Sequence, residues 1–240
     1  MITNVLATTA TVIAVAIAIA AVTTGPAVAQ VAPTASEAAA YTGLHAAAQQ
    51  GDVAKIERLA ASNAATKADL NVRDINGRTP LHVASFAKQR HAILALVKAG
   101  ADISLLDKDR YDAVTIASVA DDDETLRVLL SLGASAKLTT SRYDGTALIA
   151  AAHLGHDGVV KQLIAAGAPL DHVNNLHWTA LIESIVLGNG GPRHQEVLRA
   201  LLAAGASTRL ADRQGNTPLA LARSRGYTEM VQMLQQAGAT

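Results

Sequence analysis

Short groups of apolar residues recur along most of the chain and are separated by turn-forming residues. In residues 79–85 (TPLHVAS), a threonine suited to helix capping precedes a proline suited to the first helical position, which predicts a short helix. Ile93, Leu94 and Val97 follow at spacings typical of the buried face of a second helix. Gly100 comes next, at a place where a helix end favours the left-handed conformation. The pattern therefore predicts a unit of two short helices joined by turns.

This unit recurs with a nearly constant period. Gly-Ala dipeptides mark the end of the second helix and begin at Gly100, Gly133, Gly167, Gly205 and Gly238, in steps of 33, 34, 38 and 33 residues. A second marker lies near the start of the first helix, at Leu81, Val114, Leu148, Leu181 and Leu219, in steps of 33, 34, 33 and 38 residues. Because two short helices cannot bury their own apolar faces, each unit must stack on a neighbour. Two markers with one period thus predict a solenoid.

The units resemble ankyrin repeats. Residues 79–84 (TPLHVA) match the family's T-P-L-H-x-A pattern, residues 155–168 match the second-helix half, and Leu44 lies in a truncated first unit. The resemblance covers residues 41–240 and implies an all-α repeat solenoid of stacked helix-turn-helix units with short β-hairpin or loop connections. It implies about six repeats, which we expect at residues 41–76, 77–109, 110–143, 144–176, 177–214 and 215–240.

Three departures from the repeat pattern concern local loop geometry. The third unit has Asp112 where the second has Thr79, the fifth has a lengthened turn over residues 188–193, and an insertion lies within residues 61–71. We expect these changes to alter individual connections and to leave the architecture intact.

The first 29 residues have the pattern of an export signal. The apolar run over residues 11–22 is too short to span a bilayer comfortably, and residues 27–29 (AVA) have the small-x-small pattern of a signal-peptidase site. We therefore predict a signal peptide over residues 1–29, a flexible leader over residues 30–40 and a periplasmic protein with no membrane span after cleavage. The only positive charge of the n-region is the amino terminus, so an uncleaved N-terminal anchor is the alternative, as is full secretion.

Composition excludes several classes of function. The chain has 20 Lys and Arg against 20 Asp and Glu, so it lacks the net positive charge typical of nucleic-acid binding. It has no cysteine, which excludes disulfides, thiolate metal sites and thiol nucleophiles. Half of its residues are hydrophobic, which argues against a disordered chain.

Candidate chemistry is sparse, and we expect no catalytic residue, no cofactor and no metal. His153, His156, His172 and His177 lack a plausibly spaced third ligand. Residues 121–124 (DDDE) lie where a second helix begins, so helix capping is favoured over binding of a hard cation. The resemblance implies that His156 bonds backbone between repeats, that the other three lie on the surface or in turns, and that His45 and His82 are structural.

The resemblance also implies that hairpin tips and the exposed side of the first helices form a concave surface that binds another protein. Aromatic and arginine side chains dominate the energetics of such interfaces. The candidate partner-binding residues are Arg78, Phe86, Tyr111, Arg142, Tyr143, Trp178, Arg213 and Asn216. The alternative is that these side chains pack between adjacent hairpins and stiffen the stack.

Taken together, the sequence predicts a non-enzymatic, monomeric and exported scaffold for protein–protein interaction, with Arg78 and Arg142 fixing register through charge-assisted bonds. A secreted effector that mimics host ankyrin proteins is one alternative. An immunity protein that neutralises a toxic enzyme is another. The partner itself does not follow from the repeats, because one scaffold serves unrelated targets.

Overall fold

The computed structural model describes residues 30–62 and 67–240, so the predicted signal peptide over residues 1–29 lies outside the described residues. Within these residues most helices form consecutive pairs, with an inner helix followed by an outer helix. The pairs are α2 (Gly43–Gln50) and α3 (Val53–Ala61), α5 (Pro80–Phe86) and α6 (Arg90–Ala99), α7 (Ala113–Val119) and α8 (Asp123–Ser131), α9 (Ala147–Leu154) and α10 (Asp157–Ala165), α11 (Ala180–Val186) and α12 (Pro192–Ala203), and α13 (Pro218–Ser224) and α14 (Thr228–Gln236).

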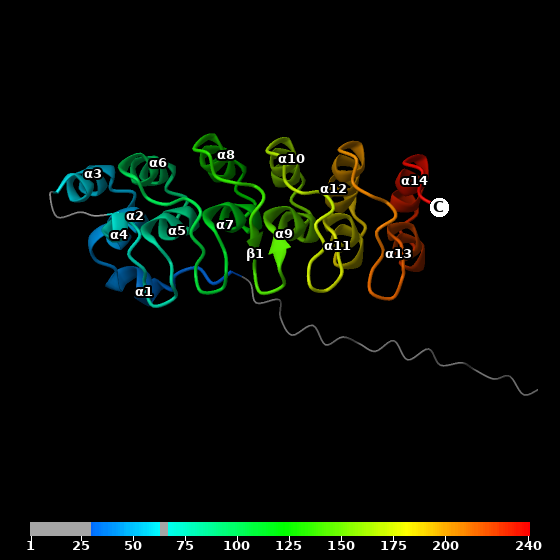
Figure 1. The fold of residues 1–240 in the computed structure, drawn as a ribbon, viewed down its shortest axis with the longest axis horizontal. Helices are drawn as coiled ribbons and strands as arrows, with labels where there is room; N and C mark the ends of the chain where they lie inside the picture. Colours follow the sequence, from blue (N-terminus) through cyan, green and yellow to red (C-terminus); the bar gives the residue numbers. More distant parts are fainter. Residues whose placement is uncertain (1–29, 63–66) are drawn as a thin grey trace, which may run out of the picture.

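The pairs stack in one row, with the outer helices in one layer, the inner helices in a second and the hairpin loops in a third (Figure 1). One hairpin contains a two-stranded antiparallel sheet, β1 (Thr139–Thr140) and β2 (Gly145–Thr146). The predicted all-α repeat solenoid with short hairpin connections is thus confirmed. In the part of the chain that the structure describes, no helix combines the length and the apolar character needed to cross a bilayer.

Each inner helix from α5 onwards begins at a polar side chain that caps it. Thr79 caps α5 by accepting a hydrogen bond from the backbone N–H of His82, and Asp112 caps α7 by accepting one from Thr115 at 2.8 Å. The departure from the repeat pattern in the third unit therefore preserves the helix start. At the other end of the unit Gly100 adopts a left-handed φ of 105°, as predicted.

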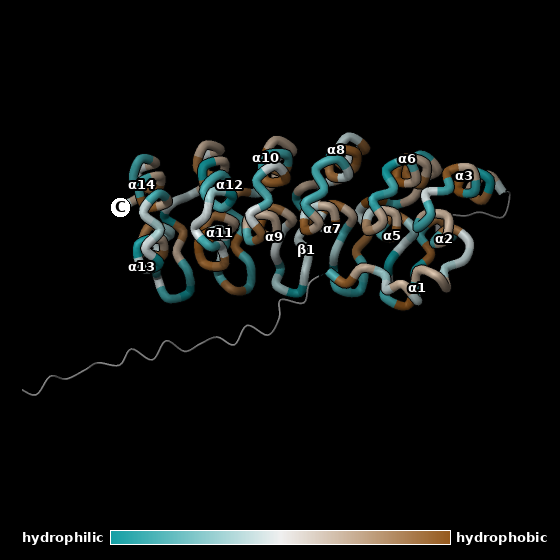
Figure 2. The backbone as a smooth tube through the Cα atoms, turned by 180° about the vertical axis from the view of Figure 1, so that it is seen from behind, coloured by the Kyte–Doolittle hydropathy of each residue, from teal (hydrophilic) through white to brown (hydrophobic). Residues whose placement is uncertain are grey.

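The core runs along the whole stack. Figure 2 shows hydrophobic positions distributed over both rows of helices rather than gathered in one centre. In α6 the buried positions are Ala92, Ile93 and Leu96, whereas Leu94 is 41% exposed, so the apolar stripe is rotated from the one that the sequence predicts. Each inner helix packs against the inner helices of adjacent units, which makes neighbouring repeats interdependent.

The segment predicted to be a flexible leader instead contains helix α1 (Ala35–Ala40). Thr34 and Glu37 form a reciprocal capping box that starts this helix. Glu37 also accepts hydrogen bonds from Asn76 Nδ2 at 2.7 Å and from Arg78 Nη2 at 3.0 Å. The leader is therefore attached to the first hairpin, and α1 lies at the level of the hairpin loops in Figure 1.

The two insertions contribute to packing. Helix α4 (Lys67–Leu70) lies within the first insertion and buries Leu70 in the core. The lengthened turn before α12 packs on the last repeat, because Tyr227 Oη donates a 3.0 Å hydrogen bond to the carbonyl of Gly188. Gly190 lies under the same ring with φ 69°, where a Cβ would approach the ring to 2.6 Å.

Candidate protein-binding surface

Each hairpin is shaped by a side chain at its first position that accepts two backbone N–H groups. Asp107 Oδ1 accepts from Asp109 and Tyr111, both at 2.9 Å, and Asn174 Oδ1 accepts from Leu176 and Trp178, both at 3.0 Å. Asp74, Ser141 and Asp212 do the same in the remaining hairpins. This geometry fixes the backbone and sends the intervening side chains to the hairpin tip.

The hairpin tips are also linked to one another. The backbone N–H of Lys108 donates to the carbonyl of Asn76 at 3.0 Å, and that of Asn175 donates to the carbonyl of Tyr143 at 2.9 Å. Arg142 Nη2 pairs with Asp109 Oδ1 of the preceding hairpin at 3.1 Å. The tips therefore form a connected edge along the stack rather than a set of independent loops.

The predicted aromatic residues lie at several depths, with Tyr111, Tyr143 and Trp178 in the hairpins and Phe86 at the end of inner helix α5. Tyr143 is 41% exposed, whereas Phe86, Tyr111 and Trp178 are half-buried. Burial is also the first cause that raises the pKa of Tyr111. Each of these residues is partly exposed, so packing between adjacent hairpins does not exclude contact with a partner.

Arg78 corrects the sequence prediction, since its side chain is only 1% exposed. It donates from Nε to Asp74 at 2.7 Å and from Nη2 to Glu37 at 3.0 Å, and its Nη1 reaches the carbonyl of Val31 at 3.3 Å. Burial disfavours the charged form of Asp74, but hydrogen bonds from Tyr41 and Arg78 outweigh that effect and lower its pKa. Arg78 thus joins the N-terminal segment to the first hairpin and is not available on the surface.

The other predicted polar residues are exposed. Arg142 carries the exposed ion pair with Asp109, and Arg213 donates to the carbonyl of Asn175 at 2.9 Å. Asn216 Nδ2 donates to the Asp212 carboxylate. All three remain accessible to a partner, although each is already engaged within or between hairpins.

Several histidines connect neighbouring repeats. His156 Nδ1 lies 2.9 Å from the carbonyl of Ser118, which confirms the bond to backbone expected between repeats. His45 Nε2 and His82 Nε2 lie 2.9 and 3.1 Å from carbonyls of the following repeats, so both histidines are structural. His172, expected on the surface or in a turn, links two successive hairpins, with Nε2 2.6 Å from the carbonyl of Asp144.

The acidic run at residues 121–124 caps a helix, as the sequence favours. Asp122 accepts from the N–H and the hydroxyl of Thr125 at 3.1 and 2.7 Å, and it pairs with Arg90 at 3.1 Å. Across residues 30–62 and 67–240, no group of three or more histidine, aspartate or glutamate side chains is placed to hold a metal ion.

A polar cluster on α11 was not predicted from the sequence. Glu183 is 5% exposed and accepts a 2.8 Å hydrogen bond from Asn174 Nδ2, while its second oxygen lies 3.6 Å from His153 Nδ1. The position equivalent to Glu183 is occupied by Val83 in α5 and by Ile116 in α7, and both side chains are fully buried. The available signal was an acidic residue at an otherwise apolar position, combined with asparagine where three of the other four hairpins begin with aspartate.

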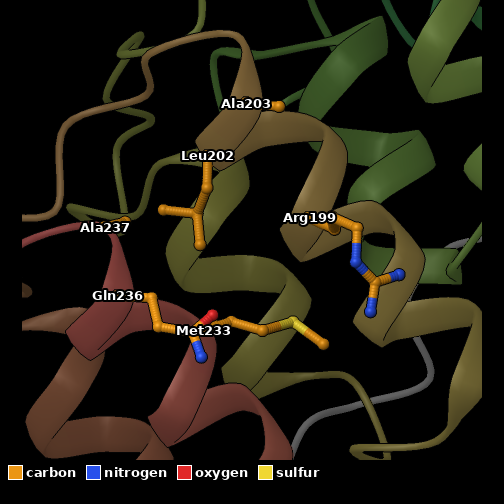
Figure 3. A pocket seen from close by; sticks show the side chains of 6 residues that line it. All are labelled: Arg199, Leu202, Ala203, Met233, Gln236 and Ala237. Atoms are coloured by element: carbon orange, nitrogen blue, oxygen red, sulfur yellow. The ribbon is translucent and has the colours of Figure 1, made fainter.

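Two hollows accompany these features. One lies among α1, α2 and the first hairpin and is lined in part by Glu37, Tyr41 and Arg78. The other lies between α12 and α14 in the outer layer, as Figure 3 shows, and is lined by Arg199, Leu202, Ala203, Met233, Gln236 and Ala237. Neither contains a set of side chains arranged for catalysis.

Comparison with known proteins agrees with this geometry. The family model described as "Ankyrin repeats (3 copies)" matches residues 19–107 and 113–207, and the model described as "Ankyrin repeat" matches residues 214–240. The chain belongs to the ankyrin repeat family. The ankyrin repeat protein YahD of Escherichia coli strain K12 is 38% identical over 194 residues, which cover 80% of this chain and 94% of that protein.

Solved ankyrin structures share the fold. An ankyrin repeat domain from Acinetobacter baumannii AYE is 43% identical with a TM-score of 0.76, over 82% of this chain and 98% of that one. The ankyrin repeat domain of Bcl-3 is 27% identical with a TM-score of 0.74, over 84% of this chain and 88% of that one. Ankyrin repeats of this kind support a role as a scaffold for protein–protein interaction.

Proposed function

We propose that this ankyrin repeat protein is an exported, monomeric and non-enzymatic scaffold that binds one partner protein along its hairpin tips and inner helices. The observation that carries the proposal is the connected row of hairpins, which holds Tyr143 and Trp178 in fixed positions in adjacent hairpins. A partner that covers these side chains gains apolar contact without having to order loops first.

The aromatic side chains are the proposed anchors of this surface. Phe86 ends helix α5, Tyr111, Tyr143 and Trp178 lie in three successive hairpins, and the exposed Ile75 and Leu176 add apolar area at the tips. Arg142, Arg213 and Asn216 supply directional bonds at the rim. Arg78 has no part in the contact, because it is buried beneath the N-terminal segment.

The proposal is tested by replacing Tyr111, Tyr143 and Trp178 with alanine together. We expect affinity purification with the wild-type chain to retain a partner that the triple variant loses, while far-ultraviolet circular dichroism stays unchanged. The control is Leu94→Ala, which removes an exposed apolar side chain from the outer layer. A folded triple variant that retains the same partner would remove this surface from the proposal.

Export is the second part of the proposal, and it rests on the signal pattern of residues 1–29. We expect cell fractionation to recover a shortened chain that begins at Gln30 in the periplasm. A full-length chain in the membrane fraction would instead indicate an anchor. A chain found in the medium or in host cells would indicate the secreted effector.

The alternative role as an immunity protein would use the same surface. Its partner would be an enzyme, and binding would inhibit that enzyme through contact with the hairpin edge. Measuring the activity of the captured partner with and without this chain separates inhibition from simple tethering.

A further inference from the structure

Glu183 projects from an inner helix into a junction between two repeats and is bonded on one side only. Its Oε1 accepts from Asn174 Nδ2 at 2.8 Å, whereas Oε2 faces His153 Nδ1 at 3.6 Å, which is too long for a hydrogen bond. The side chain is 7% exposed. Within the described residues Oε2 accepts no hydrogen bond. It is not fully enclosed by protein atoms and therefore retains contact with solvent.

The cluster lacks a permanent cation. From α9 the titratable side chain that faces Glu183 is His153, and from α12 His194 reaches the carbonyl of His153 at 2.9 Å rather than the carboxyl. The arginines of α13 and its end, Arg223 and Arg225, form no ion pair with Glu183 within 4.0 Å. Burial lowers the pKa of His153, and the neighbouring His194 and His156 lower it further, which favours the neutral ring.

The folding of the hairpin does not require this arrangement. Asp107 shapes the second hairpin in the way that Asn174 shapes the fourth, and in the helix after the second hairpin Ile116 lies at the position of Glu183. The chain therefore contains a version of the same motif in which an apolar side chain replaces the acid. A nearly buried carboxyl without a cationic partner is costly, so its presence in one repeat calls for a ligand that compensates it.

We propose that Glu183, held by Asn174 and flanked by His153, is a binding site for an organic cation, namely the guanidinium or ammonium group of a side chain on the partner protein. This inference rests on the proposed function and deepens it. Trp178 belongs to the same hairpin and donates its backbone N–H to Asn174, so the site is continuous with the aromatic part of the surface. A partner would place an arginine or lysine at this junction and apolar side chains beside it.

The titration of the carboxyl supports the assignment. Burial raises the pKa of Glu183 to about 7, and the hydrogen bond from Asn174 offsets only part of that rise. A bound cation stabilises the ionised form, which is the minor form at pH 6 and the major form at pH 8. Cation affinity should therefore increase about tenfold from pH 6 to pH 8. Protonation of His153 at low pH places a positive charge beside the site and also weakens cation binding there.

The test uses Nα-acetyl-argininamide (hereafter argininamide) as the probe and Nα-acetyl-citrullinamide (hereafter citrullinamide) as its uncharged counterpart of similar shape. Binding is followed at pH 8 by nuclear magnetic resonance through the backbone amides of Leu176 and Trp178, which donate to Asn174. We expect a Kd of about 10 mM for argininamide, as suits one charge-assisted contact, and at least tenfold weaker binding of citrullinamide.

Glu183→Gln is the matched variant, because an amide oxygen still accepts from Asn174 while the charge is lost. We expect it to remove argininamide binding and its pH dependence, whereas Glu229→Gln on the exposed face of α14 leaves both unchanged. A second variant combines Asn174→Asp with Glu183→Ile, the pair present at Asp107 and Ile116. It should fold at least as stably as the wild-type chain and should fail to bind the probe.

Three results would overturn the assignment of a cation site. They are equal binding of the two probes, argininamide binding that survives Glu183→Gln, and absence of binding to the wild-type chain. Micromolar affinity for free argininamide would overturn the assignment to a partner's side chain and indicate a small-molecule ligand instead. Because the probe needs no partner, a failure here leaves the alanine test of the aromatic surface standing on its own.

Discussion

His82 should make the stability of the stack depend on pH. Its ring is 2% exposed, Nδ1 accepts from the backbone N–H of Thr79 at 3.0 Å, and Nε2 lies 3.1 Å from the carbonyl of Tyr111. These partners assign the proton of the neutral ring to Nε2. A second proton on Nδ1 would break the bond to Thr79 and leave a buried charge. We therefore consider His82→Ile, because isoleucine occupies the equivalent position in the fourth and fifth repeats, as Ile149 and Ile182.

The size of the effect follows from linkage. Burial is the first cause that lowers the pKa of His82 from 6.5 to about 4 in the folded chain. The unfolded chain thus binds a proton on this histidine more readily than the folded chain does. The stability that neutral His82 contributes is therefore complete above pH 6.5 and is lost as the pH falls towards 4. At pH 5 the loss is about 2 kcal/mol. At pH 7.5 the variant should itself be less stable by about 1–3 kcal/mol, because Thr79 and Tyr111 lose a buried partner.

The assay is urea unfolding, followed by circular dichroism, of the wild-type chain and His82→Ile at pH 7.5 and pH 5. The raised pKa of Glu183 acts in the opposite sense, since protonation favours the folded state there, but it is common to both chains and cancels in the comparison. We expect the difference in unfolding free energy between the chains to shrink by about 2 kcal/mol on acidification. An unchanged difference would refute the reasoning.

Two further substitutions test the junctions at either end of the stack. Arg78→Met should lower the free energy of unfolding by about 3 kcal/mol, because it leaves the buried Asp74 and the part-exposed Glu37 without their cation. Arg142→Met at an exposed pair should change it by less than about 1 kcal/mol. Urea titration measures both. Gly188→Ala would place a Cβ 2.1 Å from the carbonyl oxygen of Ser184 and should cost about 2 kcal/mol by thermal melting. Gly145→Ala, whose nearest contact would be 3.5 Å, is its control, and equal melting of the two glycine variants would contradict the packing argument.

Most of the solenoid was predictable because its determinants are local. The Thr79 cap, Pro80 at the first helical position and Gly100 at the helix end all act within one unit, and the structure contains each of them. The period then requires stacking. The capping role of Asp122 was predictable for the same reason, because a carboxylate at a helix start needs only its own helix.

What the sequence did not predict depends on contacts between distant segments. Arg78 is buried because Glu37, 41 residues earlier, folds back on it through helix α1, and the pattern of Arg78 within its own repeat resembles that of exposed residues. The capping box of Thr34 and Glu37 was a local signal for α1 that sequence analysis overlooked. Glu183 was likewise hidden among apolar helical positions until its distance from Asn174 was known.

The lateral bonds between hairpin tips have a consequence for the kinetics of association. Arg142 with Asp109, and Arg213 with the carbonyl of Asn175, fix each tip against the one before it. A partner that binds to these linked tips meets a surface that is already ordered. Complex formation should therefore follow a single exponential without a slow isomerisation phase. Mutations along the edge should then change mainly the lifetime of the complex, since the encounter rate is set by diffusion and orientation.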